Sequence, residues 1–153
     1  IVVISAPSVY IALRRRLQAA SAARARPHVY LLEYDARFRM LGPSFVPYDY
    51  ARPLQLPAWL QGAADVVFAD PPFLSAECQG KTAETARFVA REWTPDGVRM
   101  VTCTGERMGE VVLSEYRGVG VRETGFEPEH ANDLGNAFRC FANFSVGGGE
   151  LRR

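Results

Sequence analysis

The residues Asp70-Pro71-Pro72-Phe73 directly follow the apolar run Val66–Ala69, so a carboxylate, two prolines and an aromatic ring end a predicted buried strand. The Asp70 carboxylate can accept a hydrogen bond from an N–H group of a target, and the Pro71 carbonyl can accept a second. Both prolines lack an N–H donor and have a fixed φ, which makes the turn stiff. Phe73 offers a flat apolar face for a base or an alkyl-ammonium chain. These residue types indicate methyl transfer to an amino nitrogen, although Asp-Pro-Pro is also ordinary turn chemistry.

Three other predicted strands end on residues that suit a nucleotide-like cofactor. The first is followed by the loop Ser5-Ala6-Pro7-Ser8, beyond which helix N–H groups can receive a carboxylate or a phosphate. Glu33 ends the second strand and can accept hydrogen bonds from ribose hydroxyls, with Asp35 as the alternative. Asp49 follows the third strand, between two tyrosines, and can reach an adenine amino group. Each residue alone could be a solvated strand end, but together they form a stronger pattern.

The elements that must position these residues alternate between short β-branched runs and helical stretches. We expect strands at 1–4, 29–33, 45–48, 65–69, 98–103, 119–126 and 138–144. Helices are expected at 8–20, where Ser8 can act as the cap, and at 36–40, 75–91 and 106–116. Five strands in βαβ order, closed by a strand pair, predict a doubly wound α/β sheet with an antiparallel edge.

This topology predicts where the functional residues meet. In open α/β sheets, ligands bind beyond the carboxyl ends of the strands, where the winding direction reverses. If the first and fourth strands are neighbours at that point, the loop 5–8 and the turn 70–73 face one crevice. The glycine-rich residues 144–153 are expected to be a flexible tail.

Size and composition limit the possible function classes. The 153 residues fit one domain, and the net charge of +1 provides no basic field for binding nucleic acid. No apolar run is long enough to span a bilayer. Cys78, Cys103 and Cys140 lack Cys-x-x-Cys spacing, so we expect free thiols in a reducing, cytoplasmic compartment and no metal site. Because Ile1 already opens a strand, we expect residues of the domain upstream of it to be missing.

Six segments carry a resemblance to a known family, and they occur in order over nearly the whole chain. They are Ser5-Ala6-Pro7-Ser8-Val9-Tyr10, Glu33-Tyr34-Asp35-x-Arg37-Phe38, Tyr48-Asp49-Tyr50, Asp70-Pro71-Pro72-Phe73-Leu74-Ser75-x-Glu77-Cys78, Lys81-Thr82-x-Glu84-Thr85 and Phe138-Arg139-Cys140. In these segments the chain resembles the class I methyltransferases formerly described as N6-adenine-specific DNA methyltransferases. The proline-containing first loop differs from the glycine loop of methyltransferases generally, but it is what this family carries.

The resemblance implies a Rossmann-like sheet of seven strands with an antiparallel last strand, and S-adenosylmethionine as the cofactor. It implies that the cofactor is bound by Ser5, Ala6, Pro7, Ser8, Glu33, Tyr34, Asp35, Tyr48 and Asp49, and that Asp70, Pro71, Pro72 and Phe73 are catalytic. The better-supported role of this family is lysine methylation of translation elongation factor 1-alpha. Its members also carry an N-terminal helical segment that this chain lacks.

The motif itself does not distinguish a lysine from an adenine. We favour a protein-lysine N-methyltransferase acting on elongation factor 1-alpha, because the near-neutral charge gives no electrostatic hold on phosphates. The first alternative is an N6-adenine methyltransferase acting on RNA or DNA, in which Asp70 and Pro71 would bind the amino group and Phe73 would stack on the base. The second is a catalytically inactive fold that serves as a binding subunit.

Overall fold

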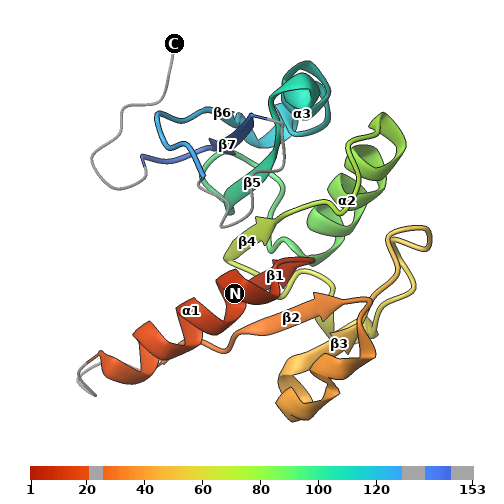
Figure 1. The fold of residues 1–153 in the computed structure, drawn as a ribbon, viewed down its shortest axis with the longest axis vertical. Helices are drawn as coiled ribbons and strands as arrows, with labels where there is room; N and C mark the ends of the chain where they lie inside the picture. Colours follow the sequence, from red (N-terminus) through yellow and green to blue (C-terminus); the bar gives the residue numbers. More distant parts are fainter. Residues whose placement is uncertain (21–25, 129–136, 146–153) are drawn as a thin grey trace.

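The computed structural model describes residues 1–20, 26–128 and 137–145. Within these ranges a seven-stranded sheet has the order β3-β2-β1-β4-β5-β7-β6 (Figure 1). Its strands are β1 (Val2–Ile4), β2 (Tyr30–Glu33), β3 (Phe45–Pro47), β4 (Val66–Ala69), β5 (Arg99–Gly105), β6 (Arg122–Glu123) and β7 (Phe138–Ala142). Strands β1 to β5 pair in parallel, whereas β7 is antiparallel to both of its neighbours. The predicted α/β sheet with its antiparallel edge is therefore confirmed.

The winding direction reverses between β1 and β4, because the chain proceeds from β1 to β2 and β3 on one side and returns to β4 and β5 on the other. Ile4 pairs with Leu32 on one side and with Ala69 on the other. This pairing continues past the strands, since the Asp70 N–H donates to the Ile4 carbonyl at 3.0 Å and the Ser5 N–H to the Leu32 carbonyl at 2.9 Å. The loops after β1, β2 and β4 therefore begin side by side.

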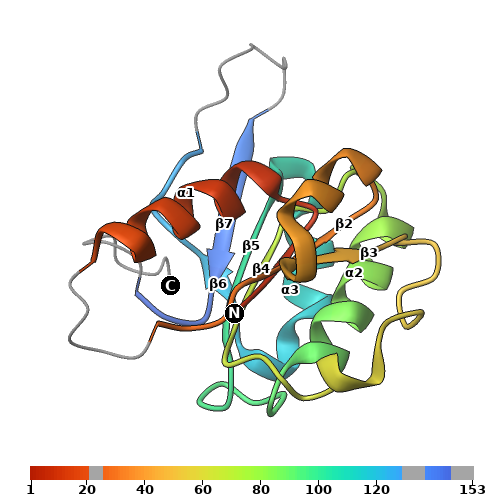
Figure 2. The same ribbon diagram turned by 90° about the horizontal axis from the view of Figure 1, so that it is seen from below.

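The two faces of the sheet are covered by different helices, as Figures 1 and 2 show. Helix α1 (Pro7–Ala19) lies on one face, and helices α2 (Ala76–Val89) and α3 (Gly109–Glu115) lie on the other. The side chains of β1 alternate between these two faces. Val3 packs in the cluster beneath α1, while Val2 and Ile4 pack in the larger cluster on the side of α2. Short 3₁₀ helices fill the connections: η1 (Ala36–Ser44), η2 (Ala58–Leu60), η3 (Glu106–Met108) and η4 (Arg117–Val119).

Two local expectations differ from the structure. Ser8 does not cap α1: the helix starts at Pro7 with Ala6 at the N-cap, because proline suits a first helical position whose N–H needs no partner. The strand expected at 119–126 shrinks to Arg122–Glu123, since η4 ends at Val119 and Gly120 then adopts a left-handed φ of 72°. By contrast, Ser75 does cap α2, where its hydroxyl accepts a hydrogen bond from the Cys78 N–H at 3.2 Å.

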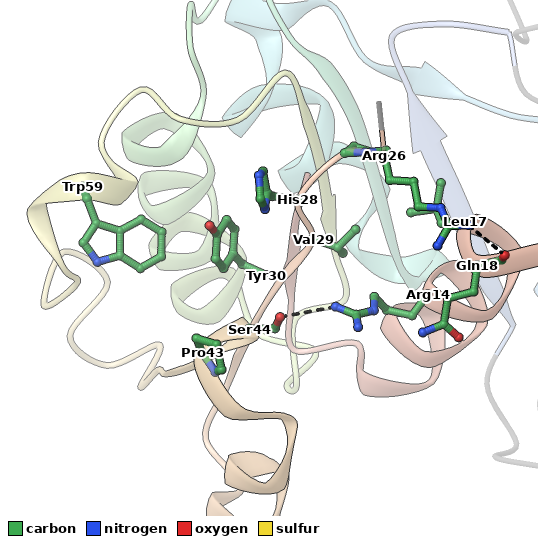
Figure 3. A pocket seen from close by; sticks show the side chains of 11 residues that line it. Arg14, Leu17, Gln18, Arg26, His28, Val29, Tyr30, Pro43, Ser44 and Trp59 are labelled. Atoms are coloured by element: carbon green, nitrogen blue, oxygen red, sulfur yellow. Dashed lines mark hydrogen bonds between the residues drawn. The ribbon is translucent and has the colours of Figure 1, made fainter. Parts of the chain in front are cut away.

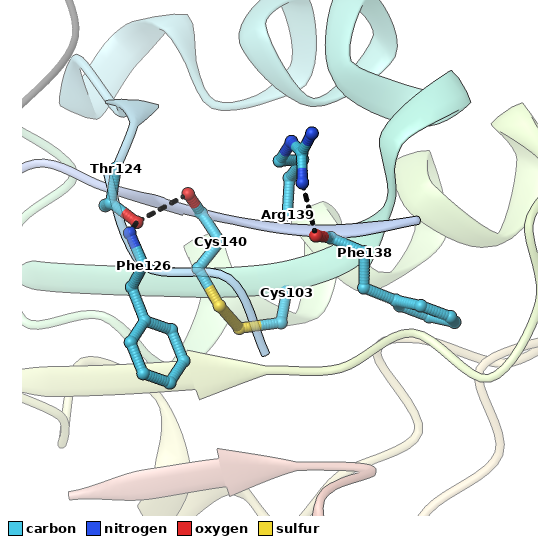
Figure 4. The surroundings of a disulfide bond; sticks show 6 residues. All are labelled: Cys103, Thr124, Phe126, Phe138, Arg139 and Cys140. Carbon is cyan, nitrogen blue, oxygen red and sulfur yellow. Dashed lines mark hydrogen bonds between the residues drawn. A yellow bond between two sulfur atoms is a disulfide. The ribbon is translucent and has the colours of Figure 1, made fainter. Parts of the chain in front are cut away.

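The expectation of three free thiols is wrong, because Cys103 and Cys140 form a disulfide (Figure 4). They stand opposite each other on the antiparallel strands β5 and β7, with their Cα atoms 4.2 Å apart. Cys78 is a free, buried thiol, and burial raises its pKa. The other expectation for the end of the chain, a flexible tail at 144–153, falls from residue 146 onward outside the described residues.

No helix in the described ranges is both long enough and apolar enough to cross a membrane. In the same ranges, no group of three or more histidine, cysteine, aspartate or glutamate side chains is arranged to hold a metal ion.

Candidate functional site

A cavity of about 470 Å³ lies beyond the carboxyl ends of β1, β2 and β3, and we call it the crevice. Its lining residues come from four loops and are Ser5, Glu33, Tyr34, Tyr48, Asp49, Tyr50, Pro72 and Phe73. All of them except Tyr50 are predicted site residues. The structure thus brings the loop after β1, the ends of β2 and β3, and the far half of the Asp-Pro-Pro-Phe turn to one place.

The end of β2 presents a fixed carboxylate to the crevice. The Glu33 Oε1 atom accepts hydrogen bonds from the backbone N–H groups of Tyr34 and Asp35, at 2.9 and 3.0 Å. These two bonds orient the carboxylate, which forms no ion pair among the described residues, so it can still accept hydrogen bonds from hydroxyl groups of a ligand. The neighbouring Tyr34 is 78% exposed and offers the crevice an aromatic ring.

Ser5 has a positive φ of 55°, which is rare outside glycine. This conformation turns the chain sharply between β1 and α1, at the position where the loop lines the crevice. Strain of this kind costs about 1–3 kcal/mol and persists where a functional site needs the geometry.

The loop after β3 is anchored to α2 by a buried tyrosine. The Tyr48 hydroxyl lies 3.0 Å from Thr85 Oγ1, and Thr85 in turn donates to the Pro53 carbonyl at 2.9 Å. Burial raises the pKa of Tyr48, so this group stays a neutral hydrogen-bonding anchor. The Asp49 Oδ1 atom accepts the Ala51 N–H at 2.9 Å and thereby closes the turn. Asp49 is thus held in the crevice by a rigid loop.

Tyr50 is the crevice residue that the predicted site set omits. Its ring centroid lies 5.5 Å from that of Phe73, so the two rings join the loop after β3 to the turn after β4. The available sequence signal was its position next to Asp49, in the same loop.

Several predicted cofactor residues lie outside the crevice. The Asp35 carboxylate forms an ion pair with Arg37, with Oδ2 at 2.6 Å from Nη2, and this guanidinium lowers the pKa of Asp35. Asp35 also accepts the Arg37 N–H and so caps η1. Ala6 is buried, and Pro7 is the first residue of α1. Ser8 belongs to a different cavity, described next.

The Asp-Pro-Pro-Phe turn is divided between two cavities. Pro72 and Phe73 line the crevice, whereas Asp70 lines a second cavity of about 520 Å³, which we call the sheet-face cavity. This cavity lies over β4, β5 and β7, on the face of the sheet that carries α1, and its floor includes the disulfide (Figure 4). Pro71 is buried and lines neither cavity.

A buried glutamine on α2 supports the turn, and sequence reasoning missed it. Gln79 is fully buried, and its Nε2 donates to Thr104 Oγ1 at 3.0 Å and to the Phe73 carbonyl at 3.3 Å. Among the described residues, its Oε1 atom has no hydrogen-bond partner. The sequence signal was a polar residue on the apolar side of a predicted helix. Gln79 therefore ties the end of the turn to β5.

A third cavity, of about 540 Å³, lies near the amino-terminal ends of β2 and β3, at the end of the strands opposite the crevice (Figure 3). Arg14 and Arg26 reach it from α1 and from the segment before β2, and Tyr30 lies between His28 and Trp59. The Arg14 Nη1 atom donates to Ser44 Oγ at 3.3 Å. None of the predicted site residues lines this cavity. The predicted site residues that line a cavity do so near the carboxyl ends of the strands.

The comparisons with known proteins agree with this arrangement. A family model described as "Probable N6-adenine methyltransferase" matches residues 1–146. The chain is 40% identical to Protein-lysine N-methyltransferase EFM5 of Saccharomyces cerevisiae over 94% of its own length and 60% of that protein. It is 36% identical to EEF1A lysine methyltransferase 1 of Danio rerio, over 92% of its own length and 78% of that protein.

Among solved structures, the crystal structure of a SAM-dependent methyltransferase from Aquifex aeolicus has a similar fold. The TM-score is 0.50 at 14% sequence identity, with 92% of this chain and 80% of that chain covered. This likeness supports the sheet topology. The chain spans about 60% of the length of the yeast protein, so the activity of the whole protein is a matter for proposal.

Proposed function

Because this chain belongs to the family described as "Probable N6-adenine methyltransferase", we propose that it is an S-adenosylmethionine-dependent protein-lysine methyltransferase acting on translation elongation factor 1-alpha. The observation that carries the proposal is the crevice, in which Glu33 and Asp49 lie together with the Pro72-Phe73 half of the turn. The substrate follows from the relatives, whose names specify a lysine of EEF1A.

The residues of the crevice fit the cofactor by their chemistry. The Glu33 carboxylate, oriented by two backbone N–H groups, suits the two ribose hydroxyls, which need acceptors. Asp49 suits an adenine amino group, and the exposed ring of Tyr34 can cover an aromatic base. When bound, S-adenosylmethionine supplies an electrophilic methyl group. Asp35 is assigned no contact, because its carboxylate is held by Arg37.

The chain's own residues must present a neutral amine. A lysine in water has a pKa of about 10.4, so its ammonium form must lose a proton before it can act as a nucleophile. Apolar surroundings lower the pKa of the amine and favour the neutral form. We assign Asp70 to orienting the amine and to receiving its proton through water, with the Pro71 carbonyl as the second acceptor.

Adenine remains the second candidate acceptor, because the family description itself names it. The net charge of +1 weighs against it, since nucleic acid binding draws most of its free energy from phosphate neutralisation. A catalytically inactive binding subunit is a third possibility, and the retained Asp70-Pro71-Pro72-Phe73 sequence weighs against it. We further propose a cytoplasmic location. The Cys103–Cys140 disulfide weighs against that location, because disulfides are rare in cytosolic proteins.

The test incubates the purified protein with labelled cofactor and separate samples of elongation factor 1-alpha, RNA and DNA. We expect label in the elongation factor, and loss of that label in Asp70→Asn with cofactor affinity retained. The matched control is Asp65→Asn, since Asp65 precedes the same strand at its other end and is exposed. Label in RNA or DNA alone would replace lysine by adenine as the acceptor, and activity retained in Asp70→Asn would remove Asp70 from the mechanism.

A further inference from the structure

Positive charge gathers in the first part of this chain, although the molecule as a whole is nearly neutral. Residues 1–32 contain five arginines and no aspartate or glutamate, whereas the net charge of the full sequence is +1. Two of these arginines, Arg14 and Arg26, line the third cavity (Figure 3). No carboxylate side chain is among the described residues of its lining. The charge of this cavity therefore favours an anion.

The two guanidinium groups keep most of their donors for a ligand. Arg14 Nη1 donates to Ser44 Oγ at 3.3 Å, and Arg26 Nη2 donates to the Gln18 carbonyl at 3.3 Å, near the end of α1. Neither arginine forms an ion pair with another described residue. A guanidinium has five N–H donors, so these bonds to neutral oxygens orient the two groups and leave donors for the oxygens of an anion.

Another part of the same lining is aromatic. The ring centroids of Tyr30 and Trp59 lie 4.9 Å apart, and His28 stacks on Tyr30 with centroids 6.5 Å apart and an interplanar angle of 18°. The large Trp59 side chain is 53% exposed. Figure 3 shows the rings of Tyr30 and Trp59 on one side of Ser44 and the guanidinium of Arg14 on the other. Flat ring faces beside oriented cations suit a ligand in which an aromatic base is joined to a phosphate.

We propose that the third cavity binds a nucleoside phosphate, whose phosphate is held by the two guanidinium groups and whose base lies against Tyr30 and Trp59. The volume of about 540 Å³ lies within the range of roughly 300–1,000 Å³ that small-molecule sites have. A free nucleotide and a nucleotide unit of single-stranded RNA present the same chemistry to this cavity. The site goes beyond the proposed methyl transfer and names no methyl acceptor, because it lies at the end of the strands opposite the Asp-Pro-Pro-Phe turn.

The base distinguishes this ligand from an acidic peptide, which would also be attracted by the arginines. Aspartate and glutamate side chains carry a carboxylate but no ring, so they would leave the exposed Trp59 indole without a ligand group to cover it. Tryptophan and tyrosine rings stack on every base, because every base has a flat face, and arginine binds phosphate through parallel hydrogen bonds. The combination of both kinds of group in one cavity therefore favours the nucleoside phosphate.

The test measures binding of adenosine 5′-monophosphate by calorimetry, with excess S-adenosylmethionine present to keep the nucleotide out of the crevice. We expect Trp59→Ala to weaken binding about fivefold to 150-fold, the equivalent of one lost stacked base, and Trp59→Phe to restore most of the affinity. Arg14→Gln should weaken binding about 10- to 150-fold, because it removes a charged hydrogen-bond donor. Ser44→Ala removes the same tie to α1 without a charge and should weaken binding less. The matched control is Arg15→Gln, at the next arginine of α1, which does not line the cavity.

A short oligoadenylate distinguishes the two sources of the ligand. Tighter binding of the oligoadenylate than of the mononucleotide, with the same losses in Trp59→Ala and Arg14→Gln, identifies RNA, and equal affinity identifies the free nucleotide. The proposal is overturned if neither probe binds at millimolar concentration, if excess S-adenosylmethionine abolishes binding, or if Trp59→Ala binds like the wild type. It is also overturned if inorganic phosphate or a polyglutamate peptide binds as tightly as the nucleotide. None of these measurements involves methyl transfer, so the proposed function is tested separately.

Discussion

The buried glutamine on α2 allows the sharpest separation of a functional from a structural role. In Gln79→Met the side chain keeps its length and unbranched shape but loses both donated hydrogen bonds, to Thr104 Oγ1 and to the Phe73 carbonyl. We expect the Phe73 end of the turn to become mobile. Turnover should then fall while the fold survives.

The expected change in the free energy of unfolding is small, because the loss of two hydrogen bonds is opposed by the removal of a buried oxygen without a partner among the described residues. Each lost hydrogen bond costs about 0.5–1.5 kcal/mol, and the buried Thr104 hydroxyl loses a partner. The substitution also removes the Gln79 Oε1 atom, which has no partner among the described residues and costs about 1–3 kcal/mol to keep buried. The free energy of unfolding should therefore change by no more than about 2 kcal/mol in either direction.

The assay combines urea unfolding with kcat and KM for methyl transfer, and the control is Gln61→Met, at an exposed glutamine. We expect kcat to fall about tenfold, which corresponds to about 1.4 kcal/mol of lost positioning, with KM for the cofactor nearly unchanged. Thr104→Val should give a non-additive effect with Gln79→Met, because both remove the same bond. The reasoning is refuted if Gln79→Met is strongly destabilised but fully active per folded molecule, since Gln79 would then be a core residue only.

Two further substitutions test other parts of the structure. Glu33→Ala should weaken cofactor binding about 10- to 150-fold, because a hydrogen bond to a charged group contributes about 1.5–3 kcal/mol, and calorimetry showing equal affinity would exclude the ribose role. Oxidised protein should be about 2–4 kcal/mol more stable in urea than reduced protein, because the Cys103–Cys140 bond closes a loop between residues 37 apart. The double variant Cys103→Ala/Cys140→Ala should be insensitive to reductant, and coincident unfolding curves for the oxidised and reduced wild type would show that the disulfide does not form.

The ends of the inner strands could be predicted from the sequence because a polar residue stands directly after each β-branched run. Glu33 and Asp49 follow this rule, and the structure places both in the crevice. The doubly wound sheet with its antiparallel edge followed from the alternation of strands and helices, but the order of its strands did not. The sequence could not decide between Glu33 and Asp35 as the ribose ligand, since only the structure shows that Asp35 forms an ion pair with Arg37.

The disulfide could not be predicted, because its cysteines are 37 positions apart and their pairing depends on the register between β5 and β7. That register is set by long-range packing, because the chain between β5 and β7 passes through α3 and β6 before it returns to β5. Gln79 was missed for a related reason. A glutamine at a buried helical position becomes meaningful only when its partners, the Phe73 carbonyl and Thr104, are known from the fold.

The division of the Asp-Pro-Pro-Phe turn between two cavities follows from the geometry of the strand that it ends. Side chains alternate between the two faces along a strand, so Asp70 continues the face of Phe68, and both line the sheet-face cavity. The two prolines then reverse the chain, and Phe73 emerges on the crevice side.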